Sequence, residues 1–124
     1  MRAILILVPP GGGETDYSLE FDLPGVPNPG DYVMVGRPAQ EGTEDFIVRR
    51  CWWQLEYPLR EEASGSIVTK PGEEPPTRIA GVTRSLAVEC EFALGPLSSK
   101  SHKTACEMYR KRKMPLKAFD ESGY

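Results

Sequence analysis

Residues 45–57, DFIVRRCWWQLEY, form the longest strand-like stretch of the chain and are too long for a small flat sheet. Extended at about 3.3 Å per residue they span about 40 Å, whereas a compact chain of this length has a radius of gyration of about 14 Å. Phe46 and Val48 share one parity, and the later apolar residues share the other: Cys51, Trp53, Leu55 and Tyr57. Because an extra residue shifts the inward parity, we predict a β-bulge near Arg49 and Arg50.

The stretch 84–94, RSLAVECEFAL, alternates more regularly than any other part of the chain. The residues expected to face inward are Leu86, Val88, Cys90, Phe92 and Leu94. The residues expected on the opposite face are Ala87, Glu89, Glu91 and Ala93. Such alternation predicts an antiparallel strand with one buried and one solvated face.

Shorter segments complete the expected elements. Strand patterns occupy residues 2–8, 17–23, 31–35 and 66–70. One helix is expected over residues 99–113, with Ser98 or Ser99 as its N-cap and Pro115 beyond its end. Residues 115–124 are expected to form a loose tail, in which Leu116 and Phe119 have the character to dock on the body.

The order of these elements defines the fold class. Gly and Pro, at 12 positions each, separate the strands by turns, and the linking loops are too short for helical crossovers. We therefore predict a mainly β (α+β) fold, a small antiparallel bent sheet or open barrel with one C-terminal helix. At 124 residues the chain has the length of a single domain, residues 1–124.

Charge is unevenly distributed along the chain. Residues 1–96 hold 8 Lys and Arg against 15 Asp and Glu, whereas residues 97–124 hold 7 against 3. The cations crowd the end of the expected helix, where they complement the helix dipole. They are either simply solvated there, or they bind an acidic partner or a nucleic acid backbone.

Cysteine content and hydropathy indicate a cytoplasmic protein. Cys51, Cys90 and Cys106 are odd in number and widely spaced, which fits neither a disulfide scaffold nor a CxxC pair. The apolar run at residues 3–8 is far shorter than the roughly 18 to 20 residues of a membrane span. It also lacks the features of a signal peptide. No membrane association is expected.

Three groups of residues were weighed as catalytic or ligand sites. Residues 11–13, three glycines after a strand, lack the Gly-Lys-Ser/Thr of a phosphate loop. His102 and Cys106 lie one helical turn apart and form a conceivable thiolate pair, but the expected position of His102 is the surface at the start of the helix. The outer carboxylates Glu20, Asp22 and Asp31 have no calcium-loop spacing. We expect no catalytic residue, no metal and no cofactor.

The cluster of Arg49, Arg50, Trp52 and Trp53 is the most distinctive group of side chains. Adjacent strand residues point to opposite faces, so one tryptophan is expected in the core and the other is expected to be exposed or covered by the helix. An exposed tryptophan beside arginine has the composition of a binding hot spot. The expected partner-binding residues are Arg49, Arg50, Trp52, Tyr109, Arg110, Lys111, Arg112 and Lys113.

Two motifs carry a resemblance to known proteins. The pattern LPxVPxPGDYV at residues 23–33, followed by FIVRRCWW at residues 46–53, resembles small β-rich proteins of bacteriophages and integrated mobile elements. The resemblance covers residues 17–57, and its motifs are structural rather than catalytic. It implies an accessory protein that acts by binding, including as an inhibitor of a host defence complex such as a CRISPR assembly.

These observations favour a non-enzymatic protein–protein interaction module. The expected partner is a larger host protein or ribonucleoprotein complex, on which an acidic face of this chain could imitate nucleic acid phosphates. The alternative is a small single-stranded nucleic-acid-binding domain that uses Arg49, Arg50, a tryptophan and the basic residues 110–113. The pI of about 5.2 counts against the alternative, since phosphate binding calls for a basic face. The sequence leaves the oligomeric state open.

Overall fold

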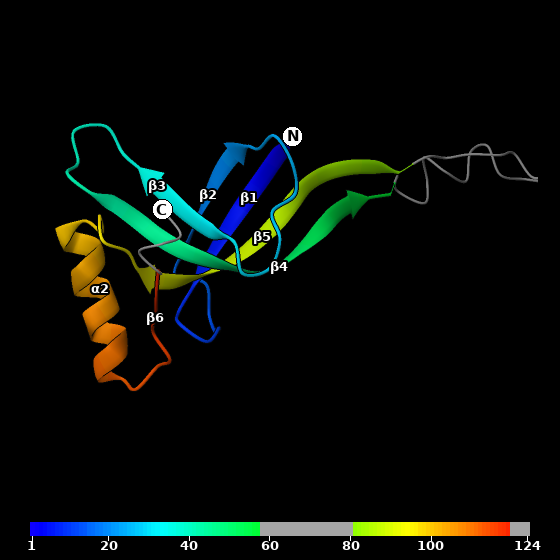
Figure 1. Cartoon of the computed structure of the whole chain (residues 1–124). Coiled ribbons are helices and arrows are strands. Elements are labelled where there is room, and N and C mark those ends of the chain that lie inside the picture. The colour runs from blue at the N-terminus through cyan, green and yellow to red at the C-terminus, as the bar shows by residue number, and fades with distance from the viewer. Residues whose placement is uncertain (58–80, 120–124) are drawn as a thin grey trace, which may run out of the picture.

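The computed structural model describes residues 1–57 and 81–119 (Figure 1). Its elements are β1 (Arg2–Val8), β2 (Tyr17–Asp22), β3 (Tyr32–Gly36), β4 (Thr43–Glu56), β5 (Val82–Leu94), α2 (Lys100–Lys111) and β6 (Lys117–Ala118). The expected mainly β fold with one C-terminal helix is confirmed, and the sheet curls into a half-barrel. The strand expected over residues 66–70 lies outside the described residues.

The sheet is not wholly antiparallel, contrary to the prediction. Its strand order is β2-β1-β5-β4-β3, and β6 pairs with β5 beside this path. β1–β2, β3–β4 and β4–β5 are antiparallel, whereas β5 runs parallel to both β1 and β6. β5 is antiparallel to β4 and enters the sheet between β4 and β1, which aligns it with β1. Long-range pairing of this kind leaves no local signal in the sequence.

The predicted bulge in β4 is confirmed. Val48 pairs with Cys90 and Arg50 pairs with Glu89, so Arg49 is the extra residue on β4. The bulge restores the inward parity, since Val48 and Cys51 on either side of it both contact the same core.

The inner face of the sheet packs against α2. Its buried side chains include Leu5, Leu7, Phe46, Val88 and Phe92, which meet Cys106 and Tyr109 of the helix. α2 begins where the Ser99 hydroxyl accepts a hydrogen bond from the His102 amide, which confirms Ser99 as the N-cap. No helix in the described part of the chain has the length and apolar character needed to cross a membrane.

β5 is covered on both faces rather than one. Ala87, Glu91 and Ala93, expected on a solvated face, are all buried. Ala93 is covered by Phe119, whose amide donates to the Leu94 carbonyl oxygen at 2.7 Å. The expectation of a loose tail is therefore wrong for residues 115–119, because β6 and Phe119 dock on the outer face of β5.

The far halves of β4 and β5 form a two-stranded ribbon that extends beyond the other strands (Figure 1). β1 pairs with β5 no further than Leu86, and β3 pairs with β4 no further than Ile47. Neither tryptophan is in the core as expected: Trp52 is 37% exposed and Trp53 is 50% exposed. Both belong to the part of the ribbon that has no neighbouring strand or helix above it.

Candidate functional site

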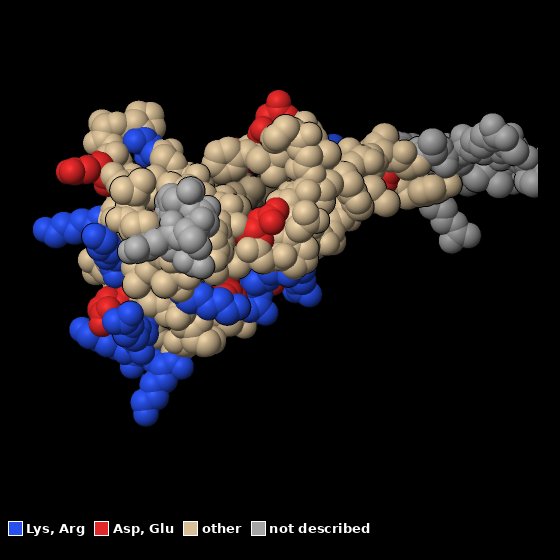
Figure 2. Space-filling model, in the orientation of Figure 1, with Lys and Arg blue, Asp and Glu red and all other residues tan. Residues whose placement is uncertain are grey.

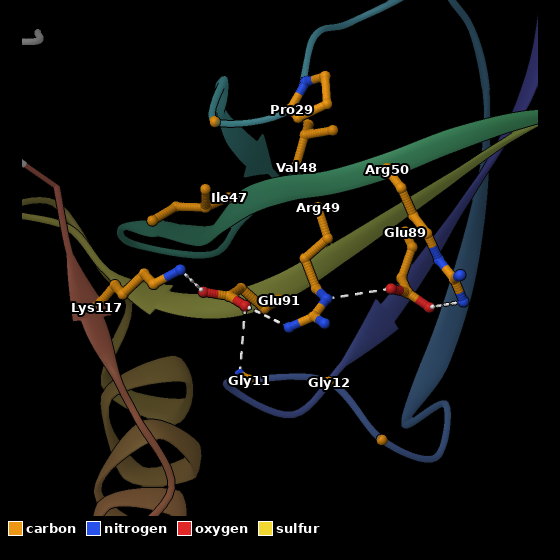
Figure 3. A pocket seen from close by; sticks show the side chains of 12 residues that line it. Gly11, Gly12, Pro29, Ile47, Val48, Arg49, Arg50, Glu89, Glu91 and Lys117 are labelled. Atoms are coloured by element: carbon orange, nitrogen blue, oxygen red, sulfur yellow. Dashed lines mark hydrogen bonds and ion pairs between the residues drawn. The ribbon is translucent and has the colours of Figure 1, made fainter.

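A row of five alternating charges crosses the outer face of the sheet, and we call it the outer charge network (Figure 3). Its members in spatial order are Lys117, Glu91, Arg49, Glu89 and Arg50. Lys117 Nζ and Arg49 Nη1 each lie 3.0 Å from a Glu91 carboxylate oxygen. Arg49 Nε lies 3.1 Å and Arg50 Nη2 lies 3.3 Å from the Glu89 carboxylate. The network joins β4, β5 and β6.

The bulge in β4 creates this network. In a regular strand Arg49 and Arg50 would point to opposite faces. Because Arg49 is the extra residue, both guanidinium groups reach the same acceptor, Glu89 of β5. The expectation of one arginine on each face held only for a regular strand, and the bulge replaces it with a pair.

Glu91 is the buried centre of the network, with 1% of its side chain exposed. Burial raises the pKa of this carboxyl, but hydrogen bonds from Lys117, Arg49 and the Gly11 amide together bring the pKa below its usual value. The carboxylate is therefore ionised at neutral pH. It holds two cations and the loop after β1 against β5.

A hollow of about 650 Å³ opens over the network. One wall is the loop of residues 11–13, where all three glycines have positive φ. A Cβ on Gly12 would lie 2.9 Å from the Arg49 guanidinium, so only glycine allows this approach. Pro29 and Gly30 border the hollow on another side (Figure 3).

Trp52 stands beside the network on the outer face. The Arg50 guanidinium lies over its indole ring, 5.2 Å from the ring centroid, a cation–π geometry. Trp52 and Arg50 thus form one composite surface, as the sequence predicted from their proximity.

The basic residues of α2 differ from those of the sheet. Every Lys and Arg of the described strands lies within ion-pair distance of a carboxylate. On the helix and the two residues after it, Arg110 alone has such a partner, Glu107 at 3.4 Å. We call the five remaining cations the free α2 cations: Lys100, Lys103, Lys111, Arg112 and Lys113.

The free α2 cations are concentrated on one side of the molecule. Figure 2 shows Lys and Arg side chains gathered along the lower side of the view, over the helix and onward beneath the sheet. The acidic excess lies elsewhere in the chain, since residues 58–80 and 120–124 hold six of the 18 acids and three of the 15 cations. The described residues thus carry twelve charges of each sign, and the basic side keeps a local positive field.

Lys113 occupies a position that normally suits glycine. Its φ is +61°, and hydrogen bonds from the Lys113 amide to Arg110 O and from the Met114 amide to Tyr109 O form a Schellman motif. A side chain in this left-handed conformation costs about 1 kcal/mol or more. A cation kept at such a cost is consistent with a role outside stability.

Tyr109 lies in the core rather than on the expected binding surface. It is 7% exposed, and its hydroxyl donates to Asp16 Oδ2 at 2.6 Å. Burial, together with the bond to Asp16, raises the pKa of Tyr109 to about 12. Its ring anchors α2 to the sheet.

His102 and Cys106 are also buried, which corrects the expected surface position of His102. The imidazole stacks on Phe92 with ring centroids 5.3 Å apart, and its Nε2 lies 2.8 Å from the Ala93 carbonyl oxygen. Burial raises the pKa of Cys106 to about 12, so its thiol is protonated at neutral pH. This pair thus lacks the thiolate that a nucleophile requires.

The sequence interpretation missed three members of the site: Glu89, Glu91 and Lys117. The available signal was two outward-facing acids on the regular strand opposite a dibasic bulge. Groups of His, Cys, Asp and Glu able to hold a metal are absent from the residues that the structure describes. Comparisons with protein-family models, curated proteins and solved structures found no match.

Proposed function

We propose that the protein is a non-enzymatic binding module that attaches to an acidic surface of a larger protein assembly through the free α2 cations. The observation that carries the proposal is the difference in pairing between sheet and helix. A cation without an intramolecular carboxylate keeps its field for an incoming surface, where it speeds association and adds charge-assisted hydrogen bonds.

The resemblance to phage and mobile-element proteins supplies a setting for this binding. In that setting the partner is a host protein or ribonucleoprotein complex in the cytoplasm, and occupation of its surface inhibits it. The exposed aromatic side chains of the ribbon, Trp52 and Trp53, add apolar contact area of the kind found at hot spots.

Capture from a bacterial lysate tests the proposal. The full chain, tagged, is compared with Lys103→Glu/Lys111→Glu and with the charge-preserving control Lys103→Arg/Lys111→Arg. We expect a stoichiometric protein that the wild type and the control retain and the glutamate variant loses. A partner retained by all three chains, or the lack of any stoichiometric partner, would contradict the proposal.

Single-stranded nucleic acid binding remains the second candidate, because the half-exposed Trp52 with Arg50 over its ring could stack a base. Nuclease treatment of the lysate separates the two functions. A partner that survives nuclease supports the protein module. Salt-dependent binding of a single-stranded oligonucleotide, lost in the glutamate variant, would favour this second candidate.

A further inference from the structure

We infer that the hollow over the outer charge network is a second binding site, which takes one carboxylate side chain of the acidic partner. The inference rests on the proposed function for the identity of the partner. It concerns a different surface from α2, built by Arg50 and Lys117 at the two ends of the network.

The charge in the hollow is positive toward solvent. Three cations and two carboxylates line it, and the two carboxylates lie beneath the cations. Glu91 and Glu89 are 1% and 12% exposed, whereas Lys117 and Arg50 are 60% and 69% exposed. An incoming group therefore meets the cations first.

The end members of the network have donors to spare. Arg50 gives one hydrogen bond, from Nη2, although a guanidinium carries five N–H donors. Its position over Trp52 limits the orientations of the guanidinium, so less side-chain freedom is lost on binding. Lys117 makes an ion pair with Glu91 alone. A carboxylate can therefore bind at the rim without displacing Glu89 or Glu91.

The surroundings favour a single carboxylate over a nucleic acid backbone. The same guanidinium and ammonium groups already bind two carboxylates at 3.0 to 3.3 Å, so their geometry suits that acceptor. Glu14 directly follows the glycine wall of the hollow, and Asp31 directly follows Gly30. These two exposed acids would repel the successive phosphates of a polyanion that ran across the rim.

Trp52 provides a reporter for the site. In a Trp53→Phe background it is the sole tryptophan, so its indole N–H gives one resonance in a ¹H–¹⁵N NMR spectrum. Hexaglutamate is the probe, and hexaglutamine and sodium chloride of equal ionic strength are the controls. We expect hexaglutamate alone to shift this resonance saturably, since it draws Arg50 toward the carboxylate.

Two variants in this background test the contact. We expect Arg50→Gln to weaken hexaglutamate binding about tenfold, as loss of one charge-assisted hydrogen bond predicts. Arg84→Gln is the matched control, because Arg84 is 59% exposed and pairs with a single carboxylate, Glu56, away from the hollow. Its affinity should stay within about twofold of the parent, since it removes no donor from the site. Thermal melting verifies that both variants are folded.

Three results would overturn the inference: a shift reproduced by chloride, equal affinity in Arg50→Gln, or saturation by inorganic phosphate without saturation by hexaglutamate. Failure of this inference is distinguishable from failure of the proposed function. If the resonance does not respond but Lys103→Glu/Lys111→Glu still loses the captured partner, only the hollow is excluded. If the resonance responds but that variant keeps its partner, the α2 proposal fails.

Discussion

The outer charge network and α2 contain similar basic side chains in opposite electrostatic situations. On the sheet, Arg49 and Lys117 hold a carboxylate that is almost fully buried, so these charges serve the fold first. On the helix, the free α2 cations have no carboxylate partner, and Lys113 has an unfavourable φ. Composition alone does not separate structural charge from available charge, whereas pairing and burial do.

The largest expected effect breaks the network at its centre. Glu91→Ala leaves Arg49 and Lys117 facing each other without the carboxylate that pairs them. We expect the free energy of unfolding to fall by about 3 kcal/mol, the scale for removing one partner of a buried ion pair. Urea denaturation measures it, and Glu20→Ala is the control, since the exposed Arg2–Glu20 pair should contribute under about 1 kcal/mol. Equal losses in the two variants would contradict the distinction.

Acidification is expected to weaken the network selectively. The folded-state pKa of Glu91 lies below its usual value, so its contribution is present above the unfolded pKa of about 4.3 and is lost as the pH falls through the folded pKa. Denaturation curves from about pH 6 to about pH 3 should show a shallower loss of stability in Glu91→Gln than in the wild type. Parallel curves would show that other carboxylates dominate.

The end of α2 offers a change in the opposite direction. Lys113→Gly removes the strain of a side chain at φ +61° and should raise the free energy of unfolding by about 1 kcal/mol. Lys113→Ala is the control, because alanine keeps the Cβ and should give no such gain. A stabilised glycine variant with weaker partner capture would sharpen the comparison, since it separates the stability of the helix from its charge.

The smallest expected effect on stability comes from the free α2 cations. Lys103→Gln/Lys111→Gln should change the free energy of unfolding by less than about 0.5 kcal/mol, because neither side chain has a carboxylate partner. The same variant should lose most of the captured partner. A marked loss of stability would show that these cations serve the fold, as those of the network do.

Much of the local structure could be predicted from the sequence. Alternation located β4 and β5, the parity change located the bulge at Arg49, and Ser99 marked the start of α2. These features depend on neighbours within a few residues, so they are visible in a single sequence.

The site was predicted only in part. Arg49, Arg50 and Trp52 were identified as a cluster, and they do lie together beside the hollow. The other predictions that failed concern burial: both tryptophans are exposed, whereas His102 and Tyr109 are buried. Burial depends on which strands and helices cover a residue, and those neighbours are distant in the sequence.

The sequence by itself determined the class of the fold, the bulge and the concentration of cations on one helix, because each follows from local periodicity or composition. Only the tertiary structure decided which cations are paired. Glu91 meets Lys117 from 26 positions later and Arg49 from 42 positions earlier, and the parallel contact of β5 with β1 brings the Gly11 loop to the same carboxylate. Pairing is a property of distance in space, and a sequence records only order.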